Sequence, residues 1–169
     1  ESINAAGEIY ARLDDKRMLA MVNGNRALLA RQLRRLDESL ELMLRTGEQA
    51  AELGDQSTMA TNFMNLGLLY LDLDRLDDAE QACREGARLA AQQNRMNFEV
   101  VCRENLCLIQ ALRGDTAGAE SALTDMMRAF PGTDKALQGG VAVTLAEIQL
   151  MAGKDALATA RGALQSLKE

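Results

Sequence analysis

The chain has 169 residues, 47% of them hydrophobic and only 3% aromatic, and its formal net charge is −6. The acidic balance argues against nucleic-acid binding, because proteins that bind phosphate backbones usually carry a clustered basic face. No apolar run approaches the length of a membrane span, and the first residues lack the basic and apolar regions of a secretory signal.

The apolar residues recur at helical spacing along the whole chain and never alternate as they do in strands. This pattern predicts nine helices joined by short polar turns, over residues 1–14, 16–32, 36–53, 57–72, 76–92, 96–113, 116–130, 134–151 and 155–168. Acidic residues occupy four of the turns, at Asp37, Asp77, Asp115 and Asp155. We expect their carboxylates to accept backbone N–H groups at the start of the next helix.

The first predicted helix is similar in sequence to a later one. Residues 1–15 lie over residues 41–55 and share Glu, Gly, Glu, Ala, Leu and Asp at the same places. Residues 41–55 belong to the second helix of a pair, so the first helix of the corresponding pair is missing. We therefore expect the chain to be a fragment of a longer protein, with an uncovered apolar edge at Ile3, Ile9 and Leu13.

The helices that follow repeat with a period of forty residues. In rows of that length, MVNGNRALLA (21–30) falls over TNFMNLGLLY (61–70) and VCRENLCLIQ (101–110). A fixed period of this length indicates stacked helical hairpins, each in contact only with its neighbours. The whole chain is thus predicted to be one repeat domain, with repeats at 16–55, 56–95, 96–133 and 134–169 after the half repeat at 1–15.

One repeat carries a family signature. Phe63, Leu66, Gly67 and Tyr70, followed by Ala79, resemble the tetratricopeptide repeat pattern of a bulky residue, Leu-Gly, Tyr and Ala. The matching residues of the next copy are Leu106, Ala119, Leu123 and Pro131. The long period resembles the repeats of bacterial regulators, such as maltose-type transcription activators and proteins with diguanylate cyclase domains. The resemblance implies an all-α, right-handed α-solenoid of antiparallel helix pairs.

A ligand is expected on the concave side of such a stack, which the first helix of each pair would line. Asn25, Asn65 and Asn105 recur there every forty residues, and Thr144 takes their place in the last copy. An amide side chain can bind both the N–H and the C=O of a peptide backbone. The column therefore resembles the asparagines with which tetratricopeptide proteins grip extended peptides. Alternatively, these asparagines bond one helix to the next.

Other side chains are expected on the same face, where they would make a mixed groove with a basic start and acidic patches beyond. They are Arg31, Met64, Leu68, Asp72, Glu104, Leu108 and Glu147. Methionine would let such a groove adapt to different partners. The alternative for the leucines and methionines is the packing of helix on helix.

The sequence offers no catalytic or metal-binding constellation. It has no histidine, and Cys83, Cys102 and Cys107 form no CxxC pair. We therefore expect three buried, reduced thiols in a cytoplasmic protein that needs no metal or other cofactor.

These features predict a non-enzymatic module that binds an extended peptide or a partner helix. An alternative is the sensor region of a larger bacterial signalling protein, which would bind a small ligand or its own effector domain. Neither nucleic acid nor a membrane is expected as a partner. Exposed repeat ends would allow homo-oligomers to form.

Overall fold

The computed structural model describes residues 2–130 and 135–166, and the side chains of residues 5–130 and 135–165. Every regular element within these ranges is an α-helix, which confirms the expected all-α stack. The helices are α1 (Ser2–Arg12), α2 (Lys16–Gln32), α3 (Leu36–Glu52), α4 (Gln56–Asp72), α5 (Leu76–Gln92), α6 (Met96–Leu112), α7 (Thr116–Ala129), α8 (Lys135–Met151) and α9 (Leu157–Ser166). Inside the described ranges, their bounds agree with the sequence prediction to within two residues.

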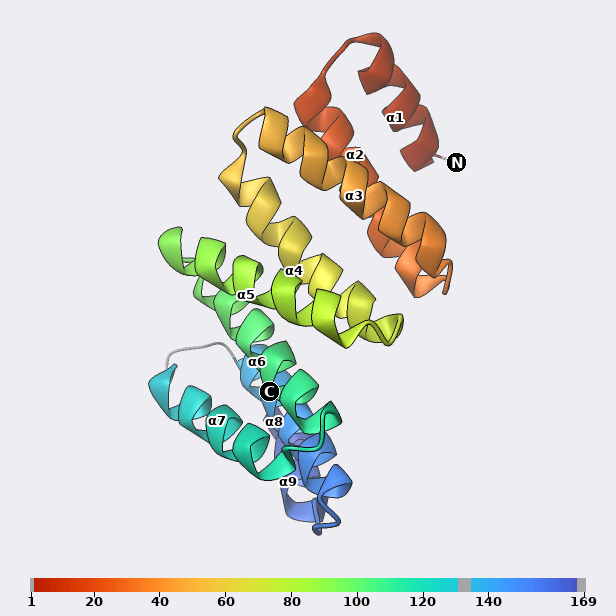
Figure 1. Cartoon of the computed structure of the whole chain (residues 1–169). Helices are drawn as coiled ribbons and strands as arrows, with labels where there is room; N and C mark the ends of the chain where they lie inside the picture. Colours follow the sequence, from red (N-terminus) through yellow and green to blue (C-terminus); the bar gives the residue numbers. More distant parts are fainter. Residues whose placement is uncertain (1, 131–134, 167–169) are drawn as a thin grey trace.

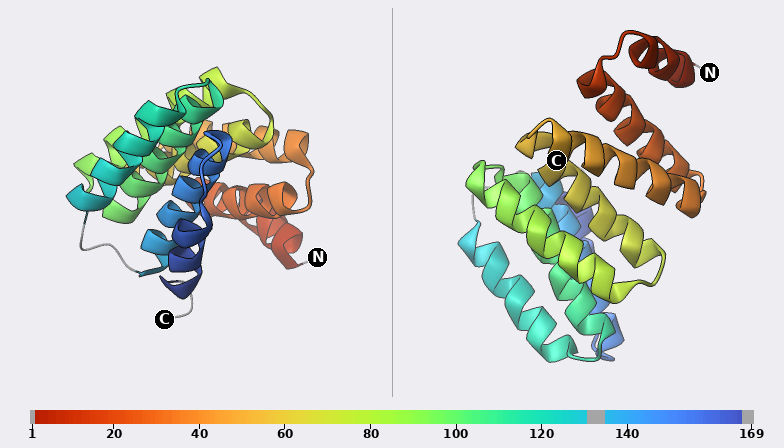
Figure 2. Two further views of the ribbon diagram at one scale, coloured as in Figure 1. Left: turned by 90° about the horizontal axis from the view of Figure 1, so that it is seen from below. Right: turned by 45° about the horizontal axis from the view of Figure 1, so that its top comes forward.

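The helices follow one another along a stack, from α1 at the top of Figure 1 to α7, α8 and α9 at the bottom. The right-hand view of Figure 2 likewise shows α1 at one end and α7 at the other. Each helix packs against the next in the chain, and α2, α4, α6 and α8 also pack directly on one another. Within the described residues, α3, α5 and α7 make no such contacts among themselves. The even-numbered helices therefore form the inner side of the stack, and we call them the inner helices; the odd-numbered ones are the outer helices.

The turns after the helices share one backbone conformation. A residue with φ between 53° and 100° follows each of α1 to α6 at intervals of twenty residues, and Gly153 does so after α8 with a φ of 70°. The six earlier residues are Asp14, Arg34, Gly54, Asp74, Asn94 and Gly114. After α2, the Arg35 N–H donates to the Ala30 carbonyl at 2.9 Å, which closes the helix end as in a Schellman motif. The repeated turn explains the antiparallel order of neighbouring helices.

Aspartates cap several of the helices. Asp115 accepts a hydrogen bond from the Gly118 N–H at 2.9 Å and caps α7, and Asp155 accepts one from the Leu157 N–H at 2.9 Å. Both bonds agree with the role expected for these two residues. Asp55 caps α4 in the same way, through the Thr58 N–H at 3.1 Å.

The capping prediction is wrong for Asp37 and Asp77. Both lie inside the first turn of their helices, and the N-cap residues are Arg35 and Arg75, whose side chains make no capping bond. A carboxylate in the first turn still faces the positive end of the helix dipole, so its position remains favourable.

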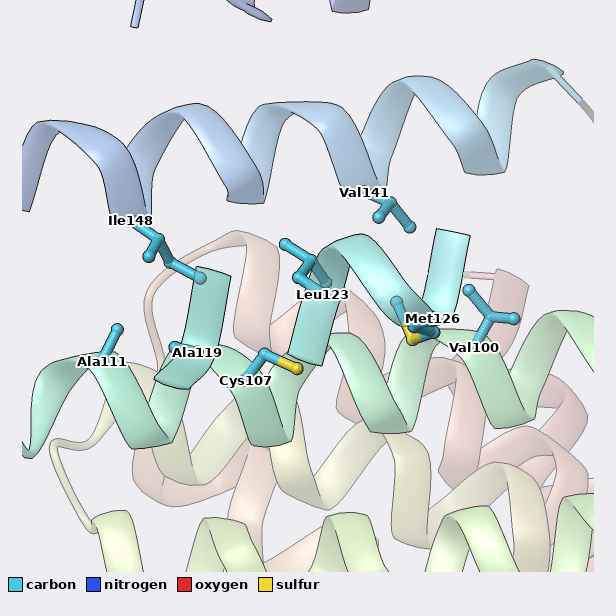
Figure 3. Close-up of a cluster of buried hydrophobic side chains, with 8 residues drawn as sticks. All are labelled: Val100, Cys107, Ala111, Ala119, Leu123, Met126, Val141 and Ile148. Carbon is cyan, nitrogen blue, oxygen red and sulfur yellow. The ribbon is translucent and has the colours of Figure 1, made fainter. Parts of the chain in front are cut away.

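Three clusters of buried side chains hold the stack together. Figure 3 shows the one formed by α6, α7 and α8, in which Leu123 and Met126 of α7 lie between Cys107 of α6 and the side chains of Val141 and Ile148 of α8. The core is thus shared between successive helix pairs, as a repeat stack requires.

Two glycines let α5 approach its neighbours closely. A Cβ added to Gly67 of α4 would overlap Cys83 Sγ of α5. A Cβ added to Gly86 of α5 would lie 2.9 Å from Cys102 Sγ of α6 and 3.2 Å from the Met64 nitrogen of α4. Both positions therefore require the absence of a side chain.

Some expectations from the sequence fall outside the described residues, namely the match at Pro131, the side chain of Ile3 and the last residues of the final helix. Ile9 and Leu13 of the expected apolar edge are 46% and 69% exposed. No described helix combines the length and the apolar character that a membrane crossing requires.

Candidate interaction surface on the inner helices

A row of leucines runs along the inner helices. Leu28, Leu68 and Leu108 occupy the same position of α2, α4 and α6, forty residues apart, and each is half-buried. Leu28 packs against a core cluster, whereas Leu68 and Leu108 belong to none of the three clusters of described side chains. Glu147 takes this position on α8 and is exposed. The row therefore changes from apolar to acidic at α8.

Further apolar side chains are exposed on the inner helices. Their exposed fractions lie between 39% and 65%, and they are Met21, Leu29, Met96, Leu112, Val143, Leu150 and Met151. Met64, in contrast, packs against the core cluster that α5 and α6 form. For this residue the structure therefore supports the alternative in which the methionine packs helix on helix. Apolar surface of this kind, mixed with polar groups, is typical of interaction sites.

The three asparagines of the predicted ladder differ in their surroundings. Asn25 is exposed, Asn65 is half-buried, and Asn105 is only 6% exposed. The Asn105 Nδ2 is enclosed and makes no hydrogen bond with the described residues. Its amide lies beside the Cys83 thiol, where it opposes the larger effect of burial, which raises the pKa of Cys83 to about 12. Asn105 therefore does not face an open groove.

The fourth member of the column links two inner helices. Thr144 of α8 is 8% exposed, and its hydroxyl donates a hydrogen bond to the Glu104 carboxylate of α6. At this position of the column the side chain therefore bonds one helix to the next, as in the alternative given for the asparagines.

The register of that bond can be counted back along the chain to the asparagines. Counted back by one repeat, it pairs Asn105 with Met64, and by a second repeat it pairs Asn65 with Gly24. The more buried Asn105 thus corresponds to a large side chain on the preceding inner helix, and the less buried Asn65 corresponds to glycine.

The basic start of the predicted groove is neutralised within the protein. Arg31 Nε donates to Asp72 Oδ2 at 2.6 Å, and Arg34 Nη1 donates to Asp72 Oδ1 at 3.2 Å. These bonds tie α2 to α4 on the inner side. Arg31 and Asp72 therefore offer little free charge to a ligand.

The acidic part of the inner side is not neutralised. Burial raises the pKa of Glu104 above its ordinary value, repulsion from Glu147 raises it further, and the hydrogen bond from Thr144 acts in the opposite direction. Within the described residues, no lysine or arginine forms an ion pair with Glu104 or Glu147. These two carboxylates form an unpaired acidic site between α6 and α8.

The cysteines offer no reactive group at neutral pH. Cys83, Cys102 and Cys107 are buried and unpaired, as expected. Burial raises the pKa of Cys102 to about 12, as it does for Cys83, and the pKa of Cys107 is also raised. Among the described residues, no group of three or more Cys, Asp or Glu side chains is arranged to hold a metal ion.

A pocket on the outer side was not foreseen from the sequence. It has a volume of about 690 Å³ and lies between α5 and α7, with α6 beneath it. Leu106, Cys107 and Met126 give it an apolar floor, and Arg103 and Gln110 stand in its wall. The sequence does contain a sign of it: with the repeats aligned at a period of forty, these two polar residues stand where the preceding repeat has Phe63 and Tyr70.

The comparisons with known proteins bear on the fold alone. No protein-family model matches the chain, and no curated protein matches it. Among solved structures, the chain is similar to the crystal structure of BtubC (BKLC) from P. vanneervenii, with a TM-score of 0.70 and 17% sequence identity. The match covers 90% of this chain and 63% of the BtubC chain, so the chain spans less than two thirds of that protein.

Proposed function

We propose that the protein is a non-catalytic interaction module, a long-period tetratricopeptide-like stack whose inner helices hold a peptide or a partner helix. The ligand places apolar side chains over Leu68 and Leu108 and a lysine or arginine beside Glu104 and Glu147. The proposal needs no catalytic residue and no cofactor.

The unpaired acidic site carries this proposal. Glu104 is half-buried and has no ion-pair partner among the described residues, and burial raises its pKa, which disfavours the ionised form. Groups that destabilise a fold in this way cluster at functional sites, where a ligand supplies the missing partner. A basic side chain would pair with both carboxylates at once and relieve their mutual repulsion.

The leucine row supports an apolar contribution to binding. Full burial of a leucine side chain stabilises by about 1.5–3 kcal/mol, so completing the burial of Leu68 and Leu108 would contribute roughly 2 kcal/mol. The stack presents these side chains on packed helices, which need little ordering when a ligand binds.

The location that we propose is the cytoplasm. The support for it is the three buried cysteines, which are unpaired in the structure. Such thiols are usual where the compartment is reducing.

Selection from a library of random peptides displayed on phage tests the function. We expect the selected peptides to carry a lysine or arginine next to leucine, isoleucine or phenylalanine. Their dissociation constants, measured by calorimetry, should rise about tenfold or more for the double variant Glu104→Gln/Glu147→Gln. The matched control is Glu48→Gln, which removes an exposed carboxylate from the outer helix α3 and should leave binding unchanged.

The thermal stability of the double variant separates loss of contact from loss of fold. Removing the like-charge repulsion should leave the variant at least as stable as the parent chain. Selected peptides that bind the double variant as tightly as the parent, or that lose binding equally with Glu48→Gln, would show that the inner acidic site is not where they bind.

A further inference from the structure

The same repeat positions form a packed core around α4 and a pocket around α6. The positions around α4 all belong to one core cluster or pack against it, and they hold Leu40, Phe63, Leu66, Leu69, Tyr70, Leu73 and Ala82. Forty residues later, the corresponding side chains line the outer pocket, and they are Glu80, Arg103, Leu106, Ile109, Gln110, Arg113 and Ala122. The site around α4 thus indicates which side chains are missing from this part of the pocket around α6.

Two aromatic rings of the α4 site are absent from the pocket. Phe63 and Tyr70 project from α4 into its core, whereas Arg103 and Gln110 replace them on α6. The floor beneath them stays apolar, with Leu106 and Ile109 in the places of leucines. The pocket in turn has larger side chains at Cys107, Met126 and Phe130, where the α4 site has Gly67, Gly86 and Ala90. The pocket of about 690 Å³ lies within the range of ~300–1,000 Å³ that small-molecule and cofactor sites usually have.

Hydrogen bonds fix the polar wall of the pocket. Arg113 Nη2 donates to Asp77 at 2.5 Å, and its Nη1 donates to Glu80. Gln110 Nε2 donates to Asp115 Oδ2 at 2.6 Å. These bonds hold the long side chains at the wall, so that they do not fold over the apolar floor.

The arginines of the wall can stack on an aromatic ring although they are ion-paired. Arg84, Arg103 and Arg113 line the pocket; Arg84 and Arg113 pair with Glu80, and Arg103 pairs with Glu99. A guanidinium group that is paired along its edge keeps its flat face for stacking on a ring. In the core around α4, the Arg75 guanidinium lies 4.8 Å from the centre of the Tyr70 ring, an example of such stacking in this fold, although the pocket has Asp115 at the place of Arg75. Met126 also lines the pocket, and a methionine sulfur makes favourable contacts with aromatic rings.

We infer that the outer pocket binds the side chain of a tyrosine or tryptophan from a partner polypeptide. The rings of the core around α4 are likewise carried by a polypeptide. The pocket lies between two outer helices that make no direct contact, so a partner chain can reach it from the outer side. This inference does not depend on the proposed function of the inner helices, because the two sites lie on opposite sides of the stack.

Methyl NMR of the whole chain with labelled methionines tests the inference. N-acetyl-L-tyrosinamide should shift the Met126 methyl signal in a saturable way and leave that of Met43, which is 1% exposed in a different core, unchanged. N-acetyl-L-leucinamide should bind at least about fivefold more weakly, because it has no ring to stack on the guanidinium groups. A blocked Ala-Tyr-Ala peptide should bind more tightly than the tyrosinamide.

Variants that fill the pocket from within provide the decisive control. Gln110→Tyr, alone or with Arg103→Phe, rebuilds the rings of the core around α4 and should weaken tyrosinamide binding about tenfold or more. Gln81→Tyr adds the same ring at an exposed position of α5 outside the pocket and should leave binding unchanged.

Four results would overturn the inference. They are the absence of any saturable shift at Met126, equal binding of the leucinamide, undiminished binding to folded Gln110→Tyr, and equal affinity for tyrosinamide and the tripeptide. The last would assign the pocket to a free aromatic molecule rather than to a polypeptide.

Discussion

Replacing Gly67 by alanine tests the close approach of α4 and α5. The added Cβ would overlap Cys83 Sγ, and Cys83 is wholly buried. Reaching an ordinary contact distance of ~3.5 Å requires a shift of about 1 Å in the sulfur or in one of the helices. The Cys83 side chain has a single torsion through which it could move, and packed side chains surround it.

The expected loss follows from two opposing effects. Forcing an extra carbon into a packed core costs about 1–3 kcal/mol. Alanine in place of glycine within a helix contributes about 1 kcal/mol in the opposite direction. We therefore expect Gly67→Ala to lower the free energy of unfolding by up to about 2 kcal/mol, which corresponds to a fall in Tm of up to roughly 8 °C for a chain of this size.

Urea unfolding of a small set of variants measures this effect. The matched control is Gly140→Ala in α8, where a Cβ would meet nothing within 4 Å. It should gain about 0.5–1 kcal/mol from helix propensity alone. Adding Cys83→Ala to Gly67→Ala removes the overlapping sulfur and should restore most of the lost stability. If Gly67→Ala stabilises the chain as Gly140→Ala does, the close approach of α4 and α5 is not as described.

The remaining predictions concern charges and thiols. Asp55→Ala should lower the free energy of unfolding by about 1 kcal/mol at neutral pH, because it removes the cap on the Thr58 N–H. That bond lowers the pKa of Asp55, so the capping stabilisation is complete above the ordinary pKa of 3.8 and is lost as the pH falls through the lower pKa of the folded chain. Urea titrations at neutral pH and in acid should therefore show that the difference in stability between the parent chain and Asp55→Ala shrinks in acid. Glu104→Gln should raise Tm at neutral pH, because burial raises the pKa of Glu104. The gain should disappear below about pH 4.5, where the carboxyl group is protonated in the folded and in the unfolded chain. A gain in Tm that persists in acid would contradict this cause. Cys83 and Cys102 should react with a thiol reagent only after unfolding, and rapid reaction in buffer would show that they are not enclosed.

The helices could be predicted from the sequence because two independent signals agree on them. The spacing of apolar residues gives the helices, and the period of forty gives their boundaries. The cap residues of α3 and α5 could not be predicted in the same way. The left-handed residues Arg34 and Asp74 place the cap at the next residue, which moves Asp37 and Asp77 into the first turn.

The candidate site could be predicted only in part. The repeat register correctly grouped Asn25, Asn65 and Asn105 on the inner helices, but it does not tell how deeply each side chain is buried. Depth depends on the side chains of neighbouring helices, such as Cys83 of α5 beside Asn105. The pairing of Arg31 with Asp72 was missed for a related reason, since it depends on the offset between α2 and α4.

The repeats also provide an internal control for distinguishing function from packing. Glu104 shares its position with Gly24, Met64 and Val143, none of which is charged, so the stack does not need a carboxylate there. Met64 shows that a large apolar side chain packs at this position. Glu104→Met should therefore stabilise the chain while it weakens binding of a basic peptide. A residue that only packs would change stability and binding in the same direction, so opposite signs would identify Glu104 as a residue kept for its ligand.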